Sequence, residues 1–511
     1  MLARIPSYLL QGIDALPCEV EVDSDLSAID SRAVIVGLPD AGIKEAIERV
    51  KSALMNSGYA WPQGRLVINL APADVRKEGP VYDLPMAVGL LAATGVLANA
   101  IGLDYRTCVL GGELALDGRV RPIKGAIALA SMAKQRGAKA VIVPAANAAE
   151  AAVVHDMPVY GVSTLPELVG LLTGAIEAEP TPPPDIVALL GTAAAPVDFG
   201  DVRGQEGVKR AVVVAAAGGH NLLMLGPPGS GKTMMAKALP GVLPPLSPQE
   251  AIDITRIYSA AGQMPSGVGL ITLRPVRSPH HTASTPSIVG GGMVPRPGEI
   301  SLAHHGVLFL DELPEFPRDV LEALRQPLED HQVTIARAHA AVRFPASFML
   351  IAAMNPTPKG DLPVGEVGRR AMEQYMSRLS GPLLDRIDIH VEAPAVPWKE
   401  LSRRDDTGPK GSTTATMREQ VLRARAAQLA RQGPGLVNAR LSGRQLDVWA
   451  KLDDDATNLL GRAMTELGLS ARAYDKIRRI SRTIADLEGC EAIQAQHVSE
   501  AIAYRLLDRK V

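Results

Sequence analysis

The sequence predicts an α/β protein in which a phosphate-binding parallel sheet is preceded by a second α/β region and followed by helices. Before a Pro-rich break at 177–185, short apolar runs alternate with Ala-rich helical stretches. After the break, a second alternation includes a glycine-rich loop at 226–233, and beyond about residue 398 the strand signals fade. We therefore divide the chain into an N-terminal α/β domain (1–176), a linker (177–197), a core (198–396) and a C-terminal helical domain (397–511).

Length and composition set the limits of this interpretation. With 511 residues, the chain is long enough for about three domains, each with its own apolar core. The 53 Lys and Arg residues balance 55 Asp and Glu residues, so the formal charge of −2 excludes a wholly basic DNA-coating protein. Three cysteines, Cys18, Cys108 and Cys490, are too widely spaced for a disulfide framework and suit a reducing compartment. The N-terminus has no long apolar run, and we expect a cytoplasmic protein.

Residues 84–103 form an uncharged stretch that is as long as a membrane span. Much of it is Ala and Gly, it is interrupted by Thr94-Gly95 and by Asn99, and it has no basic flanks. These features favour a buried helix followed by a turn. We therefore expect no membrane among the partners.

The strongest motif is a glycine-rich loop that fits the pattern G-x-x-x-x-G-K-[ST], with an apolar run before it and a helix after it. Glycines let successive backbone N–H groups curl around a phosphate at the positive end of the following helix. Lys232 is predicted to reach the β- and γ-phosphates, and Thr233 is predicted to hold Mg²⁺. A chance match by a glycine-rich turn is the alternative. The predicted loop residues are Gly226, Pro227, Pro228, Gly229, Ser230, Gly231, Lys232 and Thr233.

A pair of carboxylates follows a second apolar run, Val307 to Leu310. Such a run is typical of a central parallel strand, and its carboxyl end is the edge at which α/β proteins bind ligands. We expect Asp311 to hold the metal ion and Glu312 to orient or deprotonate the attacking water. An ordinary strand end is the alternative, but the upstream phosphate loop favours the catalytic interpretation.

Three further polar residues are candidates for sensing or completing the phosphate site. Asn355 ends the apolar run FMLIAAM and could bind the γ-phosphate or the water, although a turn-forming Asn before Pro356 is the simpler interpretation. Arg386 lies between two aspartates, which indicates either an internal salt bridge or an arginine finger offered to a neighbouring subunit. Arg472 opens a C-terminal helix and could reach the γ-phosphate of its own subunit.

The motifs GPPGSGKT, VLFLDE, AAMNP and LLDRID, together with PHHTASTPSIVGGG, resemble those of the magnesium-chelatase-like AAA+ ATPases of the ComM/YifB group. The resemblance covers essentially the whole chain. It implies a P-loop AAA+ core, a C-terminal helical lid, ATP and Mg²⁺ as ligands, and a hexameric ring that acts on DNA as a branch-migration helicase. By position, it assigns catalytic roles to Lys232, Asp311, Glu312, Asn355, Arg386 and Arg472.

The N-terminal region resembles the Lon-protease-type domain that this family carries, through GGELALDGRVRPIKGAIALA and the residues after it. A Lon-type protease needs a Ser nucleophile and a Lys base. The segment equivalent to the nucleophile loop, 77–87, contains no Ser. Ile127 stands where the base would fall, and Lys124 lies three residues earlier. We predict a domain without the Ser-Lys dyad and without proteolytic activity.

The sequence departs from this family in one metal-binding pattern. Many relatives have Cys residues just after the sensor Asn, whereas this chain reads NPTPKG at 355–360 and has no Cys between Cys108 and Cys490. We therefore expect no zinc site.

Residues predicted to contact DNA lie in two inserts of the core. In the first, Arg274, Arg277, His280 and His281 could hold phosphates in a ring pore, while packing at subunit interfaces is the alternative for histidines of this region. In the second, residues 332–344 alternate as in a β-hairpin, and Arg337 would lie near its tip. A solvated hairpin face explains Arg337 equally well.

Three functions compete at this point. The first is a DNA motor for recombination or natural transformation that binds single-stranded or branched DNA and assembles as a homo-hexamer. The second is the ATPase subunit of a magnesium-chelatase-type metal-insertion complex, which the core motifs do not separate from the first. The third, an ATP-dependent protease, requires a nucleophile that the N-terminal region lacks.

Overall fold

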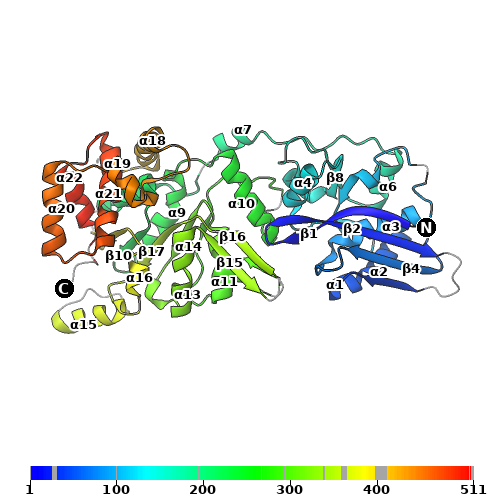
Figure 1. Ribbon diagram of the computed structural model, residues 1–511, viewed down its shortest axis with the longest axis horizontal. Coiled ribbons are helices and arrows are strands. Elements are labelled where there is room, and N and C mark those ends of the chain that lie inside the picture. The colour runs from blue at the N-terminus through cyan, green and yellow to red at the C-terminus, as the bar shows by residue number, and fades with distance from the viewer. Residues whose placement is uncertain are drawn as a thin grey trace. The chain divides into compact units, whose positions relative to one another are not determined.

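The computed structural model of the chain describes residues 2–25, 32–98, 100–193, 195–265, 267–292, 294–337, 340–357, 365–397, 411–505 and 507. The chain folds into two compact units, whose elements are labelled in Figure 1. The first unit comprises Met1–Gly191, Ser247–Thr272 and Val294–Pro297, and the second comprises Thr192–Leu246, Leu273–Met293 and Gly298–Val511. These units differ from the predicted segments, because the core and the helical region share one unit and part of the core folds with the N-terminal region.

A four-stranded sheet of order β1-β2-β4-β3 opens the first unit. β1 (Leu2–Gln11) and β2 (Asp14–Asp25) form a hairpin whose turn contains Gly12 at a φ of 68°, a conformation that favours glycine. β4 (Arg65–Ala71) is antiparallel to β2, and β3 (Ala33–Val36) is parallel to β4. The helices beside this sheet are α1 (Ala41–Lys44), α2 (Ala46–Asn56) and α3 (Asp83–Ala93).

The apolar stretch at 84–103 gives a buried helix followed by a turn, as its Thr-Gly break predicts. Every residue of α3 is buried, and α3 packs on β1 and β2. The helix ends at Ala93, and Gly95 follows at a φ of 82°. Among the described residues, no helix combines the length and the apolar character that crossing a membrane requires.

The second half of the first unit is a parallel sheet of β5 (Cys108–Leu110), β8 (Ala140–Pro144) and β9 (Val159–Val162). Its helices are α4 (Ala126–Gln135), α5 (Ala145–Ala151) and α6 (Leu165–Thr173), and a short hairpin pairs β6 (Glu113–Leu114) with β7 (Val120–Arg121). The predicted linker at 177–197 contains the short helix α7 (Ile186–Gly191).

The helix α10 (Pro248–Ala261) belongs to this first unit although it follows the phosphate loop in sequence. Its limits follow from local chemistry: Ser247 and Glu250 form a capping box, Pro248 occupies the first turn, and Gly262 ends the helix in the left-handed region. It packs on α4, where the N–H of Gly125 donates to the carbonyl of Ser259 at 3.3 Å.

The second unit is built around a parallel five-stranded sheet of order β11-β14-β17-β10-β18. The central strands are apolar and buried, as expected for a parallel sheet covered on both faces. The strands are β10 (Leu222–Leu225), β11 (Val276–Arg277), β14 (Val307–Leu310), β17 (Met349–Met354) and β18 (Ile389–Glu392). Packed against them are α8 (Glu206–Gly218) and α9 (Lys232–Val242).

Short elements connect β11 to β18. The predicted hairpin at 332–344 is present as β15 (Gln332–Arg337) and β16 (Ala340–Pro345), in antiparallel register. The other elements are α11 (Thr285–Val289), β12 (Gly290–Gly291), β13 (Arg296–Pro297), which belongs to the first unit, α12 (Glu299–Leu302), α13 (Arg318–Ala323), α14 (Arg325–Asp330), α15 (Gly365–Met376) and α16 (Gly381–Leu384).

The C-terminal helices share one apolar core with the parallel sheet. Buried side chains of α18 and α21 belong to the same cluster as Phe309 and Ile351 of the sheet. This continuous core explains why the predicted helical domain is not a separate unit. The helices are α18 (Thr414–Gln432), α19 (Gly443–Trp449), α20 (Asp454–Glu466), α21 (Ala471–Glu488) and α22 (Ala495–Ala503). Residues 398–410 lie outside the described residues.

Candidate nucleotide-binding site

Three neighbouring parallel strands bring the predicted phosphate-site residues to one edge of the sheet. β10 pairs with β17, and β17 pairs with β14, all in parallel. Gly226 follows β10, Asp311 follows β14, and Asn355 follows β17. The carboxyl ends of all three strands therefore meet, which is where open α/β sheets bind ligands.

The phosphate loop requires glycine at specific positions. A Cβ on Gly226 would lie 2.0 Å from the carbonyl oxygen of Ala393, so no larger residue fits there. Gly229 and Gly231 have φ values of 79° and 87°, in the left-handed region that disfavours other residues. Directly after this turn, Lys232 begins α9, whose first N–H groups therefore point at the loop.

The ammonium group of Lys232 is held at the loop by oxygen atoms. It donates to the carbonyls of Gly226 at 2.7 Å and Pro227 at 2.9 Å, and it lies 3.3 Å from Oδ1 of Asn355. Burial lowers the pKa of Lys232, although the charges of Asp311 and Glu312 act to raise it. The predicted phosphate-binding amine and the predicted sensor amide thus lie in direct contact.

Thr233 and Asp311 form an oxygen pair that suits Mg²⁺. The Thr233 hydroxyl donates to Oδ2 of Asp311 at 2.9 Å, and Oδ1 of Asp311 accepts the N–H of Glu312 at 3.0 Å. Hard oxygen donors of this kind are the ligands that Mg²⁺ prefers, usually with several waters and substrate phosphates completing its shell. The donor set therefore fits the predicted ion.

Glu312 is adjacent to the metal pair and is contacted by a residue predicted to bind DNA. Its backbone has a φ of 53°, and its side chain is 47% exposed. Nδ1 of His281 lies 3.2 Å from Oε2 of Glu312, while the His281 ring lies against His280 and meets Phe316 edge-on. In this arrangement His281 serves the candidate catalytic carboxylate instead of lying free for a DNA phosphate.

The other predicted DNA contacts are also occupied or undescribed. Arg274 donates to the carbonyls of Pro244 at 2.7 Å and His305 at 2.6 Å, and Arg277 forms a two-pronged ion pair with Glu299. These contacts fix the insert in place and leave little of either guanidinium for a phosphate. Arg337 ends β15, and its side chain lies outside the described residues.

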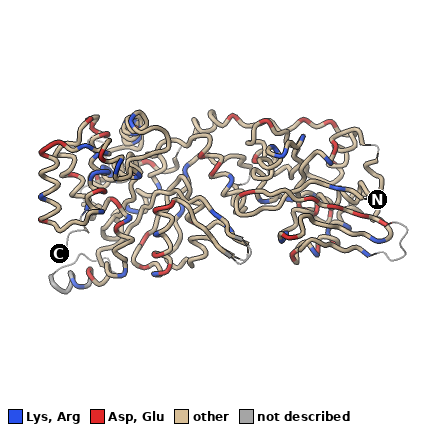
Figure 2. The backbone as a smooth tube through the Cα atoms, viewed as in Figure 1, with Lys and Arg blue, Asp and Glu red and all other residues tan. Residues whose placement is uncertain are grey.

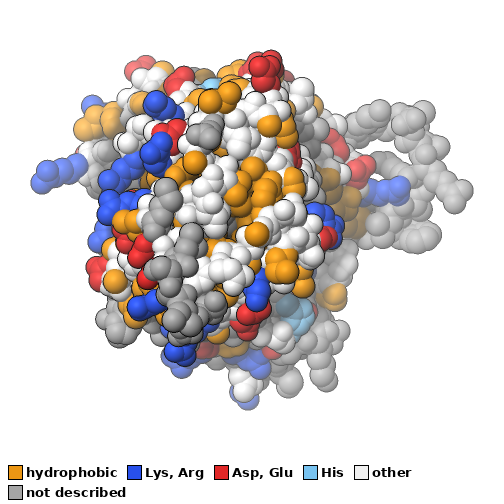
Figure 3. Space-filling model, turned by 90° about the vertical axis from the view of Figure 1, so that its right-hand side faces the viewer, with side chains coloured by type: hydrophobic (Ala, Val, Ile, Leu, Met, Phe, Trp, Pro, Cys, Tyr) orange, Lys and Arg blue, Asp and Glu red, His pale blue; other side chains and the backbone are white. Residues whose placement is uncertain are grey.

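Charged residues of both signs occur throughout the described part of the chain (Figure 2). Lys and Arg are interspersed with Asp and Glu along the backbone in Figure 2. On the face shown in Figure 3, charged side chains of both signs lie among hydrophobic ones. DNA binding therefore stays a prediction from the sequence.

Arg386 and Arg472 line a cavity of about 490 Å³ that none of the phosphate-loop residues lines. Arg386 forms an ion pair with Glu329 and donates to the Pro382 carbonyl at 2.6 Å. Arg472 forms an ion pair with Asp385 at 3.1 Å. The prediction that Arg472 serves the γ-phosphate of its own subunit is thus not supported by its position, because it lies with Arg386 instead of with Lys232.

A buried ion pair explains the position of Arg472. Four residues further along α21, Lys476 lies 3.0 Å from Oδ1 of Asp388, which directly precedes β18. Burial acts to raise the pKa of Asp388, but the charge of Lys476 and the hydrogen bond with His220 outweigh it and hold this pKa far below its usual value. The pair anchors the first turns of α21 beside the Arg386 segment.

Asn221 is a functional candidate that the sequence analysis missed. Its Nδ2 donates to the carbonyl of Arg386 at 3.0 Å, and its Oδ1 accepts the N–H of Leu350 at 2.9 Å. It therefore ties the Arg386 segment to β10 and β17, which carry the phosphate loop and Asn355. A single Asn before an apolar run carries no distinctive signal, so only the long-range contacts reveal it.

The first unit contains a cavity beside the segment 77–87, which the Lon-type resemblance equates with a nucleophile loop. Its volume is about 380 Å³, and its lining includes Val81, Tyr82 and Lys124. The described residues that line it include no Ser, Thr or Cys. Ile127 is fully buried at the start of α4, where its N–H donates to Glu150 at 3.1 Å. The absence of a Ser-Lys dyad stays a prediction from the sequence.

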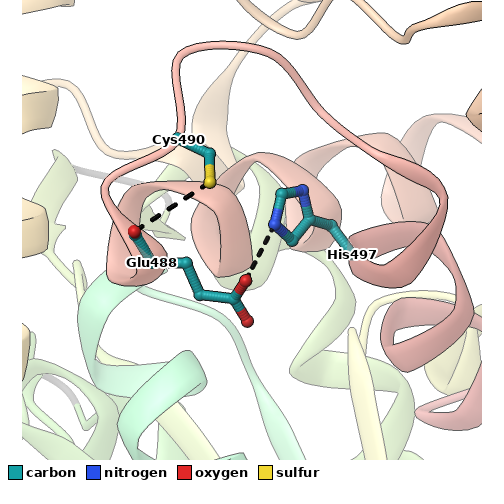
Figure 4. Close-up of side chains that lie close together, drawn as sticks. All are labelled: Glu488, Cys490 and His497. Carbon is teal, nitrogen blue, oxygen red and sulfur yellow. Dashed lines mark hydrogen bonds and ion pairs between the residues drawn. The ribbon is translucent and has the colours of Figure 1, made fainter.

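Glu488, Cys490 and His497 bring three potential metal ligands within 4.8 Å of one another (Figure 4). However, Nδ1 of His497 accepts the N–H of Gln494 at 2.9 Å, which places the proton of the neutral ring on Nε2. Nε2 then donates to Glu488 at 3.0 Å. This network caps α22 and uses the nitrogen that a metal would need.

Comparisons with known proteins agree with this arrangement. Three family models match: "Magnesium chelatase, subunit ChlI" at 198–401, "Subunit ChlI of Mg-chelatase" at 19–147, and "Magnesium chelatase, subunit ChlI C-terminal" at 411–505. The chain is 44% identical to the competence protein ComM of Haemophilus influenzae, over 99% of this chain and 98% of that protein. It is 43% identical to the uncharacterized protein YifB of Salmonella typhimurium, over 99% and 98%. A distant similarity of 23% identity covers 61% of this chain and 37% of the DNA replication licensing factor Mcm6 of Drosophila melanogaster.

Proposed function

The chain belongs to the magnesium-chelatase-like AAA+ ATPases of the ComM/YifB group, and from this premise we propose that it is a Mg²⁺-dependent ATPase that moves or remodels DNA. The family resemblance supports assembly of the chain into a hexameric ring. The observation that carries the ATPase is the cluster of Lys232, Thr233, Asp311 and Asn355 at one sheet edge. The DNA-directed part of the proposal is supported by the family resemblance, by a relative named for competence and by a distant relative named for DNA replication licensing.

The residues at this edge divide the work of phosphoryl transfer. The loop N–H groups and Lys232 would bind the β- and γ-phosphates, with the amine exchanging its carbonyl partners for phosphate oxygens. Thr233 and Asp311 would hold Mg²⁺, which when bound supplies neutralisation of phosphate charge. Glu312 would orient the attacking water and accept its proton, while Asn355 would contact the γ-phosphate or that water.

The positions of Arg386 and Arg472 support a site completed by a second copy of the chain. Both arginines line a cavity away from the loop of their own chain. An arginine that stabilises transition-state charge must reach the transferred phosphate, so we assign both to the nucleotide of a neighbouring protomer. Their ion pairs with Glu329 and Asp385 would then be exchanged for phosphate.

The decisive experiment measures the ATPase rate with no DNA, single-stranded DNA, duplex DNA and a four-way junction, with particle size followed in ATP. We expect hydrolysis, assembly in ATP, stimulation by DNA and ATP-dependent branch migration that weakens as salt rises. A rate that none of the DNAs changes, in a protein that hydrolyses ATP, would refute the DNA motor. No hydrolysis by the assembled protein would refute the ATPase itself.

A second candidate is the ATPase subunit of a metal-insertion complex, because the matching family models carry the magnesium chelatase name. The same phosphate site would serve that role. Incorporation of Mg²⁺ into a porphyrin on mixing with chelatase partner subunits, with no response to DNA, would favour it over the DNA motor.

A further inference from the structure

The cavity that contains Arg386 and Arg472 holds more positive charge than these two residues supply. Its lining also includes Lys476, Arg440 and Arg479. We call this set of five cations and the space between them the arginine cavity. Arg472, Lys476 and Arg479 lie four and three residues apart on α21, a spacing that places them along one face of a helix.

Three of the five cations are already neutralised by carboxylates. Arg386 pairs with Glu329, Arg472 pairs with Asp385 at 3.1 Å, and Lys476 pairs with Asp388 at 3.0 Å. Within the described part of the chain, Arg440 and Arg479 form no ion pair, and the remaining acid of the lining, Asp475, forms none either. The positive charge of Arg440 and Arg479 is therefore available to a ligand.

Each of these two arginines is oriented by one neutral acceptor. Nε of Arg479 donates to the carbonyl of Leu441 at 2.9 Å, and Nη2 of Arg440 donates to Oγ of Ser347 at 2.6 Å. Both terminal nitrogens of Arg479 are left without a partner among the described residues. A guanidinium that is fixed through Nε and has both Nη atoms unbonded is preorganised to donate two hydrogen bonds to a phosphate.

The ring of His331 shows that the charge of Arg440 reaches into the arginine cavity. Burial first, and then the neighbouring charge of Arg440, lower the pKa of His331 to about 4. The nearby carboxylate of Asp330 acts in the opposite direction but does not restore the ordinary pKa, so the imidazole is neutral at neutral pH.

We infer that Arg440 and Arg479 bind the phosphates of a nucleotide carried by a second copy of the chain, beside Arg386 and Arg472. This inference rests on the proposed function and adds two residues to its shared site. Arg386 and Arg472 must each break an ion pair to bind the phosphates, and the free energy of that ion pair offsets part of the free energy gained from phosphate binding. Arg440 and Arg479 break no ion pair, so they supply the first attraction for the incoming triphosphate.

The test compares Arg479→Gln and Arg440→Gln with Arg462→Gln, an exposed arginine of α20 that supplies a control with the same loss of charge. Gln at 479 keeps an amide that can donate to the Leu441 carbonyl, so the local fold is preserved. We expect both cavity variants, as unassembled single chains, to bind a fluorescent ATP analogue at their own phosphate loop as the parent does. In the assembled state, we expect their ATPase rate to fall at least tenfold. The Arg462→Gln rate stays within twofold of the parent rate.

Mixed assemblies of two variants test whether Arg479 acts on the nucleotide of a neighbouring protomer or only stabilises its own fold. Arg479→Gln has an intact phosphate loop, and Lys232→Ala has an intact arginine cavity. In an equimolar mixture, some interfaces therefore combine the intact loop of one variant with the intact cavity of the other. We expect the mixture to regain a substantial part of the parent rate, although each variant alone is at least tenfold slower than the parent. No recovery, or full activity of both cavity variants alone while Arg386→Ala is inactive, would overturn this inference and leave the proposed ATPase standing. An inactive parent protein would refute the proposed function instead.

Discussion

Two lysines that line candidate sites, Lys232 in the second unit and Lys124 in the first, differ in the partners that hold their amines. Lys232 is buried and contacts three oxygen acceptors at 2.7 to 3.3 Å. Lys124 lines the cavity of the first unit, where burial and the charge of Arg296 lower its pKa. In the described residues, no acceptor is placed to hold its amine. The comparison teaches that a cavity and a nearby amine do not make a site without partners that orient the amine.

The neighbours of each lysine reinforce this contrast. Beside Lys232, the phosphate loop has glycine at three positions that require it. A close backbone contact restricts Gly226, and a left-handed backbone conformation restricts Gly229 and Gly231. Around Lys124, the cavity is lined by the apolar Val81, and Ile127 is fully buried. The amine of Lys232 thus has a set of oriented polar partners, whereas the amine of Lys124 has none among the described residues.

The largest expected effect separates these two lysines directly. Lys232→Ala removes the amine that would neutralise phosphate charge, so we expect the ATPase rate to fall by about 10²- to 10³-fold. Lys124→Ala should leave the rate unchanged, because nothing connects its amine to the nucleotide. Steady-state ATPase assays measure both, and an equal loss in the two variants would break the comparison.

Two buried carboxylates extend the comparison to stability. Asp388 in the second unit has two partners, Lys476 and His220, whereas Asp83 in the first unit has Arg49 at 2.9 Å. Burial raises the pKa of Asp83 to about 6 despite Arg49. The pKa of Asp388 is instead held far below its usual value. One carboxylate is thus stabilised as an anion, and the other is not.

We expect Asp388→Asn to cost the second unit about 3–5 kcal/mol, because it leaves Lys476 buried without a counter-charge. Asp83→Asn should cost the first unit about 1 kcal/mol or less at pH 8, because it removes an anion that burial disfavours. Hydrogen exchange of the α21 and α3 amides reports the two units separately. Similar losses in both units would contradict the assignment.

The same pair predicts opposite responses to pH. Because the folded pKa of Asp83 is raised to about 6, its contribution to stability is full below the ordinary value near 4 and declines as pH rises to 6. Asp388 has a lowered folded pKa, so its contribution is full above its ordinary value and is lost only in stronger acid. Protection of α3, corrected for intrinsic exchange, should therefore fall by up to about 3 kcal/mol between pH 4 and 7. Over the same pH range, the pairing of Asp388 should cause no fall in the protection of the α21 amides.

A smaller effect tests whether Asn221 positions Arg386. Asn221→Ala removes the bond to the Arg386 carbonyl, and we expect the turnover number to fall about tenfold while the affinity for ATP stays the same. The matched control is Asn56→Ala in the first unit, which loses a comparable bond from Asn56 to the Leu116 carbonyl. A loss of ATP affinity in Asn221→Ala, or an equal effect of Asn56→Ala, would show that Asn221 has no positioning role.

Local motifs explain how much of the site could be predicted. The loop at 226–233, the strand before Asp311 and the strand before Asn355 each carry their signal within a few residues, and parallel pairing brings them together. The hairpin at 332–344 and the buried helix within 84–103 were predictable for the same reason. Periodicity and turn residues determine such elements without long-range information.

The remainder depended on contacts between distant residues. The position of Arg472 follows from the Lys476–Asp388 pair, 88 residues apart in sequence, and the role of Asn221 follows from bonds to Arg386 and Leu350. Arg274 and Arg277 matched a phosphate-binding pattern, but backbone carbonyls and Glu299 engage them. Spacing in a sequence does not show which of several possible partners a charged side chain will meet.

The path of the chain through α10 has a consequence for any attempt to separate the units. Because the polypeptide leaves the second unit at Ser247, returns at Leu273 and crosses again around Val294–Pro297, cleavage in the Pro-rich segment would not release an independent N-terminal piece. A fragment truncated at Gly191 would lack α10, expose the surface of α4 that it covers and leave Glu150 without Ser259. Successful excision would therefore need a graft of 247–272 onto the fragment.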